Sequence, residues 1–441
     1  MPLRIVVIGG GAAGFFAAIA CAETHPHTQV LLLEAGRQLL GKVRISGGGR
    51  CNVTHACFDP AVLVQHYPRG SKVLRGPLSQ FQPSNTIDWF AAHGVQLKTE
   101  PDGRMFPITD DSATIVDCLI RAAQAAGVEI CTGAAVTAVS RKTAVYPASP
   151  LALATGSATQ SNGQALVPAR PETTTSDFFE IQLKSNQIVH SDRLLLATGS
   201  STQGYQIAKT LGHRIEPPVP SLFTFNVLDP RLQDLAGVAV ETAHLRLQVL
   251  DRVNFEQTGP LVITHWGLSG PAVLKLSAWA ARALHDNHYQ ATLEINWLPQ
   301  FNREVLRQKL LTCKTEWSRK VIAAQCPLPL PRRLWHHLVA SVGIDTQKRW
   351  AELSHKTLNQ LIQELTQGVF TVKGKGIFKE EFVTCGGVSL SEVNFKTLES
   401  RRCPGLYFAG EVLDIDGVTG GFNFQSAWTT AWIAGQAMGC L

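Results

Sequence analysis

The chain has 441 residues, which is too long for one ordinary hydrophobic core, so we expect two or three domains. Hydrophobic residues make up 45% and charged residues 17%, as is typical of a globular protein, and no apolar run reaches the roughly 18 residues that a membrane-spanning helix needs. The net charge of +6 permits an anionic partner, either a bound dinucleotide or nucleic acid, without requiring one.

The N-terminal segment predicts a strand, a glycine turn, a helix and a second strand. Residues 4–8 are rich in β-branched side chains, residues 12–24 are rich in alanine, and residues 30–33 are apolar and end at Glu34. This order forms a βαβ unit, and continuous apolar runs are typical of parallel strands buried on both faces. We therefore expect an α/β fold with a Rossmann-like domain.

The first turn carries the spacing G-x-G-x-x-G at Gly9, Gly11 and Gly14. Gly9 permits a tight turn, Gly11 lets a pyrophosphate approach the backbone, and Gly14 lets the helix pack closely on the strand. The helix N-terminus would stabilise the phosphates, and Glu34 would accept hydrogen bonds from a ribose. The predicted cofactor contacts in this part of the fold also include Ala12, Ala13, Ala35 and Val136.

The first part of the cofactor domain, residues 1–215, is interrupted by an insertion of unusual composition. Helix and strand patterns cover residues 112–139 and resume over 178–197. Between them, residues 147–176 are mostly Pro, Ala, Ser, Thr, Gly, Asn and Gln, with few large apolar residues. Such a segment cannot bury enough surface to order itself, so we predict a flexible surface insertion.

Three further parts follow in the chain. Residues 216–300 contain short segments of alternating polarity, which indicate a mostly β substrate domain inserted into the first domain. Residues 301–370 have helical periodicity and predict a helical subdomain, and residues 371–441 return to the strand and glycine-loop pattern of the cofactor domain.

Glycine-rich strand ends recur along the chain and favour FAD over NAD as the resident cofactor. They lie at Thr198-Gly199, Gly410-Glu411 and Gly420-Gly421. A large cofactor lying across several strand ends needs this close backbone approach. Glu411 would hydrogen-bond the ribityl chain, and the Gly420-Gly421 pair would present backbone N–H groups to the flavin ring or the pyrophosphate.

The ten cysteines are scattered without a C-x-x-C pair, which indicates reduced thiols rather than a disulfide framework. Cys51, His55 and Cys57 lie close together in sequence, but a zinc site usually needs a second ligand pair at defined spacing, and none is evident. We therefore expect no metal site. The apolar start runs directly into glycines, as a buried strand does rather than a secretion signal, so we expect a cytoplasmic protein.

At this point the chain resembles the BaiN/RdsA-type (YhiN-like) family of NAD(P)/FAD-dependent flavoproteins. The resemblance rests on blocks in order along nearly the whole chain: "IGGGAAG" (8–14), "GKVRISGGGRCNVTH" (41–55), "GRMFPITDDSATIVDCL" (103–119), "THWGLSGPAVLKLS" (264–277), "VTCGGVSLSEVNFKTLES" (383–400) and "GLYFAGEVLDIDGVTGGFNFQSAW" (405–428). It implies non-covalent FAD in a domain of the two-dinucleotide-binding type, with an inserted β-barrel-like domain and a small helical subdomain. The loop over residues 199–205 is shorter than in the family pattern, which puts its cofactor or substrate contacts in doubt.

The activities that the resemblance implies are varied. They include reduction of a uracil C=C bond in large-subunit ribosomal RNA to dihydrouridine, reduction of unsaturated steroid-like enones, and oxidation of a small aminoketone. The leading prediction is NAD(P)H-dependent reduction of a C=C bond in rRNA uridine. An enone reductase, an amine or aminoketone oxidase that uses oxygen, and a non-catalytic flavin-bearing RNA-binding factor remain alternatives.

Candidate flavin contacts gather in the "SGGGRCN" block and in the last glycine loop. Lys42 and Arg50 lie in a stretch without acidic residues and would neutralise the FAD diphosphate or an anionic flavin, whereas Arg37 and Arg44 are read as surface residues. The remaining predicted contacts of the two blocks are Gly48, Cys51, Asn52, Phe422 and Asn423.

Two residues are candidates for the acid that protonates the substrate. Cys51 would lie beside the flavin, where a thiol of tuned pKa can donate a proton, or it is simply a small packing residue there. His265 would face the flavin from the inserted domain as an acid or a substrate anchor, or it satisfies a buried turn. NAD(P)H would visit the flavin transiently, because only one dinucleotide fingerprint exists, and oxygen remains an alternative acceptor.

A basic group in and after the helical region could face RNA, or it is an ordinary solvated surface. It comprises Arg332, Arg333, Lys348, Arg349, Lys373, Lys375 and Lys379.

Overall fold

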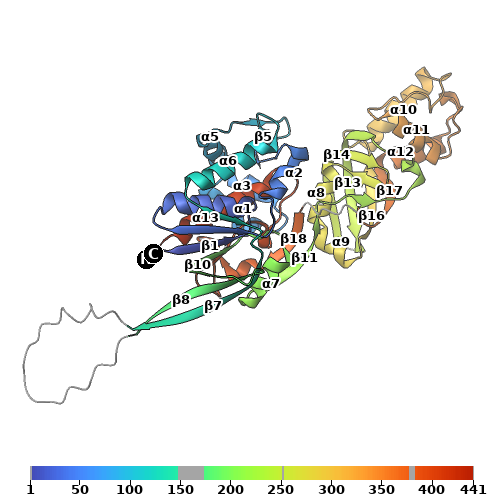
Figure 1. Cartoon of the computed structure of the whole chain (residues 1–441). Coiled ribbons are helices and arrows are strands. Elements are labelled where there is room, and N and C mark those ends of the chain that lie inside the picture. Colours follow the sequence, from blue (N-terminus) through green and yellow to red (C-terminus); the bar gives the residue numbers. More distant parts are fainter. Residues whose placement is uncertain (1, 148–172, 251–252, 377–382, 441) are drawn as a thin grey trace, which may run out of the picture.

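The computed structural model describes residues 2–147, 173–250, 253–376 and 383–440 (Figure 1). Most of the predicted flexible insertion over 147–176, together with Lys379, lies outside these described residues.

A seven-stranded sheet forms the centre of the first domain. In spatial order its strands are β19 (Val393–Asn394), β20 (Glu399–Ser400), β21 (Leu406–Phe408), β10 (Arg193–Leu196), β1 (Arg4–Ile8), β2 (Gln29–Glu34) and β6 (Glu129–Thr132). The strands from β21 to β6 run parallel, as the continuous apolar runs predict. Ile8 pairs with Leu33 and with Leu196, and Leu196 pairs with Phe408, so the carboxyl ends of four strands meet at one edge of the sheet.

Helices cover the sheet as expected for a doubly wound fold. Helix α1 (Ala12–Thr24) is buried almost all round, because α13 (Phe422–Met438) packs against it. At their crossing, a Cβ on Gly435 would lie 2.7 Å from the Ala17 carbonyl oxygen, so only glycine permits this spacing. Helices α6 (Ser112–Ala125) and α7 (Thr202–Thr210) and the three-stranded sheet of β7 (Val136–Pro147), β8 (Thr173–Leu183) and β9 (Ile188–Ser191) complete the main layers.

The segment after β2 builds a cap over the strand ends. It comprises α2 (Gly41–Gly49), β3 (Thr54–His55), α3 (Pro60–Leu63), α4 (Ser71–Gln80), α5 (Pro83–Ala92), β4 (Leu97–Thr99) and β5 (Arg104–Pro107).

The inserted domain has its own hydrophobic core. The chain enters it by β11 (Ile215–Ser221) and leaves it by β18 (Val383–Val388), and these two strands pair with each other. Its six-stranded sheet runs β12 (Phe225–Asn226), β15 (Gly267–Ser269), β14 (Val253–Thr264), β13 (Ala239–Val249), β16 (Gln290–Asn296) and β17 (Gly368–Lys373). Helices α8 (Pro271–Trp279) and α9 (Ala281–Asp286) follow β15.

Three helices connect β16 to β17 and form the predicted helical subdomain. They are α10 (Arg303–Glu316), α11 (Arg332–Ser341) and α12 (His355–Gln367). Strand β17 pairs with β16 along residues 368–373. The chain thus returns first to the inserted sheet, and only β18 re-enters the first domain, which is later than residue 371.

Two arginines, Arg69 and Arg282, fasten the inserted domain to the first domain, one by a hydrogen bond and one by an ion pair. Arg69 pairs with both carboxylate oxygens of the buried Asp416, and its Nη1 donates to the Ala278 carbonyl at 2.6 Å. Arg282 donates to Asp414 at 2.8 Å. Among the residues described, no helix is both long and apolar enough to cross a membrane.

Candidate flavin site

The first glycine turn has the geometry that the fingerprint predicts. A Cβ on Gly14 would lie 1.8 Å from the Gly9 carbonyl oxygen, and one on Gly9, whose φ is +114°, would lie 2.4 Å from the Ala197 oxygen. A Cβ on Gly11 would meet no atom within 4 Å. Gly9 and Gly14 are therefore fixed by packing, whereas Gly11 faces open space at the N-terminus of α1, where Ala12 and Ala13 lie.

Glu34 stands at the end of β2 and is held in place. Its Oε2 accepts a hydrogen bond from the Gly10 N–H at 2.6 Å, and its Oε1 accepts one from Gly36 at 2.7 Å. The carboxylate keeps further lone pairs for a ribose, so the predicted ribose contact stays a prediction. Ala35 follows it at the surface, and Val136 is buried at the start of β7.

The ends of β10 and β21 form a second wall. Lys42 Nζ lies 2.5 Å from Glu411 Oε2, and Glu411 Oε1 accepts from the Thr384 N–H at 2.9 Å. Gly410 has a φ of +74°, and a Cβ there would lie 2.8 Å from the Ala13 Cβ. Because Gly410 has no side chain, the backbone at the end of β21 lies close to Ala13. This leaves room for an extended ligand along the strand ends.

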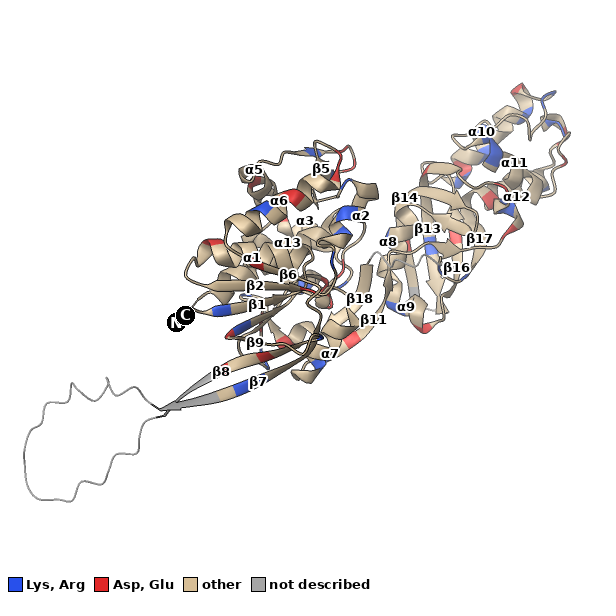
Figure 2. Cartoon of the chain, viewed as in Figure 1, with Lys and Arg blue, Asp and Glu red and all other residues tan. Residues whose placement is uncertain are grey.

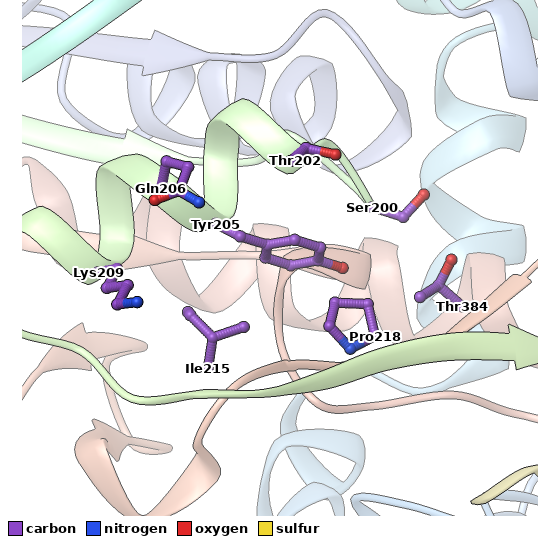
Figure 3. A pocket seen from close by; sticks show the side chains of 8 residues that line it. All are labelled: Ser200, Thr202, Tyr205, Gln206, Lys209, Ile215, Pro218 and Thr384. Atoms are coloured by element: carbon purple, nitrogen blue, oxygen red, sulfur yellow. The ribbon is translucent and has the colours of Figure 1, made fainter. Parts of the chain in front are cut away.

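A cleft of about 400 Å³ opens beside this wall (Figure 3). It is lined by Ser200, Thr202, Tyr205, Gln206, Lys209, Ile215, Pro218 and Thr384. Ser200 Oγ lies 3.3 Å from Lys42 Nζ, so the cleft adjoins the Lys42–Glu411 pair. The buried Tyr205 hydroxyl and Thr198 Oγ1 find no hydrogen-bond partner within the described parts of the chain. Such orphaned polar atoms fit a site that a polar ligand completes.

The "SGGGRCN" block forms a left-handed ledge at the end of α2. The φ angles of Gly47, Gly48 and Gly49 are +58°, +71° and +85°, and that of Cys51 is +61°. A Cβ on Gly47 would lie 2.9 Å from the Phe106 ring, whereas Cβ atoms on Gly48 and Gly49 would meet nothing within 4 Å. The first glycine thus packs inward, and the next two present bare backbone to open space.

Hydrogen bonds join this ledge to the last glycine loop. The Asn52 amide, oriented to satisfy both neighbours, donates to the Thr54 carbonyl and accepts from the Gly421 N–H, each at 3.0 Å. A Cβ on Gly421 would lie 2.4 Å from the Thr54 oxygen, and Trp428 Nε1 donates to the Val53 carbonyl at 2.9 Å. Two segments about 370 residues apart therefore form one wall.

Three predicted contacts are engaged with protein groups. The Arg50 guanidinium pairs with Glu100 at 2.7 Å and lies 4.0 Å above the centre of the Phe106 ring. The Asn423 amide donates to the Gly417 carbonyl and accepts from the Gly417 N–H, both at 2.8 Å, which holds the loop in shape. Phe422 is buried against two histidine rings. Their contacts with FAD stay predictions.

The two candidate acids lie in opposite environments. Cys51 has no exposed surface, and burial raises the pKa of its thiol to about 12, although a hydrogen bond with Ser46 opposes the shift. This environment favours the packing interpretation, because such a thiol holds its proton too tightly to donate it readily. His265 is exposed in the loop between β14 and β15, with its ring centre 5.9 Å from that of Trp266, so it does not satisfy a buried turn.

The structure adds a cluster that the sequence reasoning missed. His55 and His66 stack on Phe422 with ring centres 4.6 and 4.2 Å away, and His55 Nδ1 lies 2.9 Å from the Gly420 carbonyl. Burial lowers the pKa of both histidines, and Lys275 of α8 is near enough to lower them further. The cluster thus lies beside the last glycine loop and within electrostatic range of Lys275 in the inserted domain. His55 and Lys275 lie in the quoted blocks 41–55 and 264–277, but nothing in the sequence marked His66.

Comparison with known proteins now identifies the family. The model for the HI0933-like protein Rossmann domain matches residues 3–169, and the model for the HI0933-like protein barrel and H2TH domain matches residues 219–383. An Escherichia coli protein named ribosomal RNA dihydrouridine synthase is 30% identical over 98% of this chain and 96% of its own length. The chain belongs to the HI0933-like family.

Two other relatives of this HI0933-like protein are similar over almost the whole chain. A Clostridium scindens protein named 3-dehydro-bile acid delta(4,6)-reductase is 29% identical over 98% of both chains. A Haemophilus influenzae ribosomal RNA dihydrouridine synthase is 28% identical over 97% of this chain and 96% of its own length. These matches confirm the BaiN/RdsA-type resemblance and the FAD-binding Rossmann fold with an inserted barrel domain.

This member of the HI0933-like family is an FAD-dependent oxidoreductase. The dinucleotide would be held at the strand ends by three features. The glycine turn and the ledge present bare backbone, and the Lys42–Glu411 pair presents charged groups. No group of three or more His, Cys, Asp or Glu side chains that could hold a metal ion occurs in the described residues.

Proposed function

We propose that this protein catalyses the NAD(P)H-dependent reduction of a C=C bond conjugated to a carbonyl group, with uridine in large-subunit ribosomal RNA as the leading substrate. The observation that carries the proposal is the 30% identity, over 98% of the chain, to the Escherichia coli ribosomal RNA dihydrouridine synthase. The glycine-rich ends of the parallel strands support the proposal, because their exposed backbone suits FAD.

The reaction adds one hydride and one proton across the double bond. FAD, when bound, takes two electrons from NAD(P)H and supplies the hydride to the carbon β to the carbonyl, which is C6 of uracil. The protein must orient the ring, exclude water and deliver the proton to the neighbouring carbon, C5.

We expect the proton donor on the inserted domain, and the candidates are His265 and Lys275. His265 is exposed, and Lys275 lies near the two histidines that stack on Phe422. Cys51 is the weaker candidate, because its enclosed thiol is a poor acid. Substitutions His265→Gln and Lys275→Met separate the two: the donor's loss should slow substrate reduction at least about 100-fold while flavin reduction by NAD(P)H is unchanged.

The test of the function is anaerobic. The FAD-loaded protein is reduced with NADH or NADPH, then mixed with rRNA that lacks dihydrouridine, with a steroid-like enone, or with oxygen, while flavin absorbance is followed. We expect rRNA to reoxidise the flavin and to gain dihydrouridine. Reoxidation by oxygen alone, together with reduction by an amine, would assign the protein to the oxidase class instead.

A second candidate substrate is a small steroid-like enone. It is favoured by the 29% identity to the bile acid reductase over 98% of both chains. Both reactions saturate a double bond next to a carbonyl, so the same site chemistry serves either. Rapid reoxidation by the enone combined with inert rRNA would decide for this candidate.

A further inference from the structure

The positive charge of the chain is concentrated in one part. Residues 301–367, which hold α10 to α12, contain eleven Lys and Arg against five Asp and Glu, an excess of six. The whole chain has 40 against 34, which is also an excess of six, so all other residues together are balanced. One of the five acids, Glu364, is neutralised by Arg231, which lies between β12 and β13 of the inserted domain, at 2.7 Å.

The cations of these helices are free of carboxylate partners, whereas several cations of the first domain are paired. In the first domain Lys42, Arg104 and Arg141 each pair with an acid at 2.5 to 2.8 Å. None of the eleven cations of residues 301–367, all of which the structure describes, lies within 4.0 Å of an acidic oxygen in the described residues. A surface that leaves its cations unpaired can neutralise an external anion without breaking internal ion pairs.

Backbone pairing brings four of these cations together. An isolated β-bridge joins Val321 to Arg349, and hydrogen bonds of 3.0 Å run from the Ile322 N–H to the Lys348 carbonyl and from the Trp350 N–H to the Lys320 carbonyl. Arg319 precedes this pairing. We call Arg319, Lys320, Lys348 and Arg349 the basic patch; its members are exposed except for the half-buried Lys348.

The basic patch lies far from the flavin site. Figure 1 shows α10 to α12 at the end of the molecule opposite the seven-stranded sheet, with the inserted sheet between them. Figure 2 shows Lys and Arg recurring over these helices and their connections. A small unsaturated substrate cannot touch both places at once, whereas a long polyanion can.

We propose that the basic patch binds the phosphate backbone of the RNA substrate while the target base occupies the flavin site. The inference rests on the proposed function, and it names how that substrate is held. Four cations without carboxylate partners, gathered on two adjacent segments, match the regular charge of an RNA backbone, and phosphate contacts fix position without reading sequence. Specificity for the uridine then belongs to the flavin site.

The test compares two variants of equal charge. The patch variant carries Arg319→Gln, Lys320→Gln, Lys348→Gln and Arg349→Gln. The control variant carries Arg75→Gln, Arg121→Gln, Lys184→Gln and Lys396→Gln, which are exposed positions of the first domain. Binding of the FAD-loaded proteins to a labelled fragment of large-subunit rRNA is measured by fluorescence anisotropy over a series of salt concentrations.

We expect the patch variant to bind the RNA about tenfold more weakly, and the slope of log Kd against log salt to fall by about three, as four lost phosphate contacts predict. The control variant should change the slope by less than about one unit. Equal losses in both variants would overturn the inference, because only net charge would then matter. Loss of binding to anionic lipid vesicles with RNA binding unchanged would also overturn it.

Two further readouts keep the outcomes distinct. Thermal unfolding of both variants should match the wild type, since all the altered side chains except Lys348 are exposed. If the quadruple variant unfolds early, the pair Arg319→Gln and Lys320→Gln is used with half the expected slope change. Reoxidation of reduced flavin by an enone should be unchanged. If wild-type protein forms no dihydrouridine but the patch variant alone loses RNA affinity, the proposed function fails and the basic patch stands.

Discussion

At the residue scale, the glycines of the first turn differ in what they do. Gly14 and Gly11 are three residues apart, yet an added Cβ would collide with the Gly9 oxygen at 1.8 Å in one case and meet open space in the other. The motif therefore contains one glycine that the fold needs and one that only a ligand needs. The sequence alone does not show this difference, because both glycines belong to the same G-x-G-x-x-G motif.

Substitution at these two positions should separate folding from cofactor binding. Gly14→Ala should lower the thermal stability of the apo-protein strongly, because the helix must move away from the strand. Gly11→Ala should leave that stability within about 1 kcal/mol of wild type but lower the FAD content. Unfolding of apo-protein and flavin absorbance of purified protein measure the two effects. Equal stability losses would contradict the assignment.

Cys51 should be dispensable for chemistry. Because its thiol is buried and its pKa is raised to about 12, we expect Cys51→Ala to keep FAD content and to keep turnover within about twofold. A small cavity should cost about 1 kcal/mol in urea unfolding. A fall in turnover of 100-fold with full FAD content would instead make Cys51 the acid.

His66 should make the protein sensitive to acid. Burial lowers its pKa from 6.5 to about 4, so the unfolded chain binds more protons between these pH values. Stability is complete above pH 6.5 and falls as the pH drops toward 4. His66→Phe should reduce the fall in unfolding free energy between pH 6.5 and 4.5 by about 2 kcal/mol. The exposed His27→Gln serves as the control and should leave the profile unchanged.

At the scale of elements, the sequence patterns predict strands and helices well where the contacts are local. Residues 4–8, 12–24 and 30–33 match β1, α1 and β2 within one residue. A helix buried along one stripe shows apolar residues with a period of 3.6, and a strand buried on both faces shows a continuous apolar run. These patterns suffice to predict β1, α1 and β2.

The same patterns could not predict which distant segments meet. The hydrogen bond between Asn52 and Gly421, and the nearness of Lys275 to the histidine pair, depend on the path of the chain through two domains. Strand β17 is another case: its alternation over 368–373 is visible, but its partner β16 ended 72 residues before β17 begins. For that reason the predicted boundary near residue 371 falls inside the inserted sheet.

At the scale of the whole molecule, a buried ion pair of the first domain holds Arg69, whose guanidinium also donates to the Ala278 carbonyl of the inserted domain. Asp416 is fully buried, and Arg69 is nearly so, with 12% of its side chain exposed. Breaking such a pair leaves an uncompensated buried charge, which costs about 3–5 kcal/mol.

Asp416→Asn should therefore destabilise the protein by several kcal/mol in urea unfolding, and it should loosen the inserted domain toward proteolysis. The double variant Asp416→Asn with Arg69→Met removes both charges and should recover part of the loss. A double variant no more stable than Asp416→Asn would show that the hydrogen bond of Arg69 to Ala278, rather than the charge pair, dominates.

The pairing of β11 with β18 places Ser221 directly opposite Val383. The point where the chain leaves the first domain and the point where it returns are thus neighbours, separated by a single strand spacing of about 5 Å. The inserted domain could therefore be removed or exchanged as a unit at the level of the gene. A two-residue turn could replace everything between these residues without altering the register of the seven-stranded sheet, and another substrate domain with adjacent ends could be spliced onto the same flavin module.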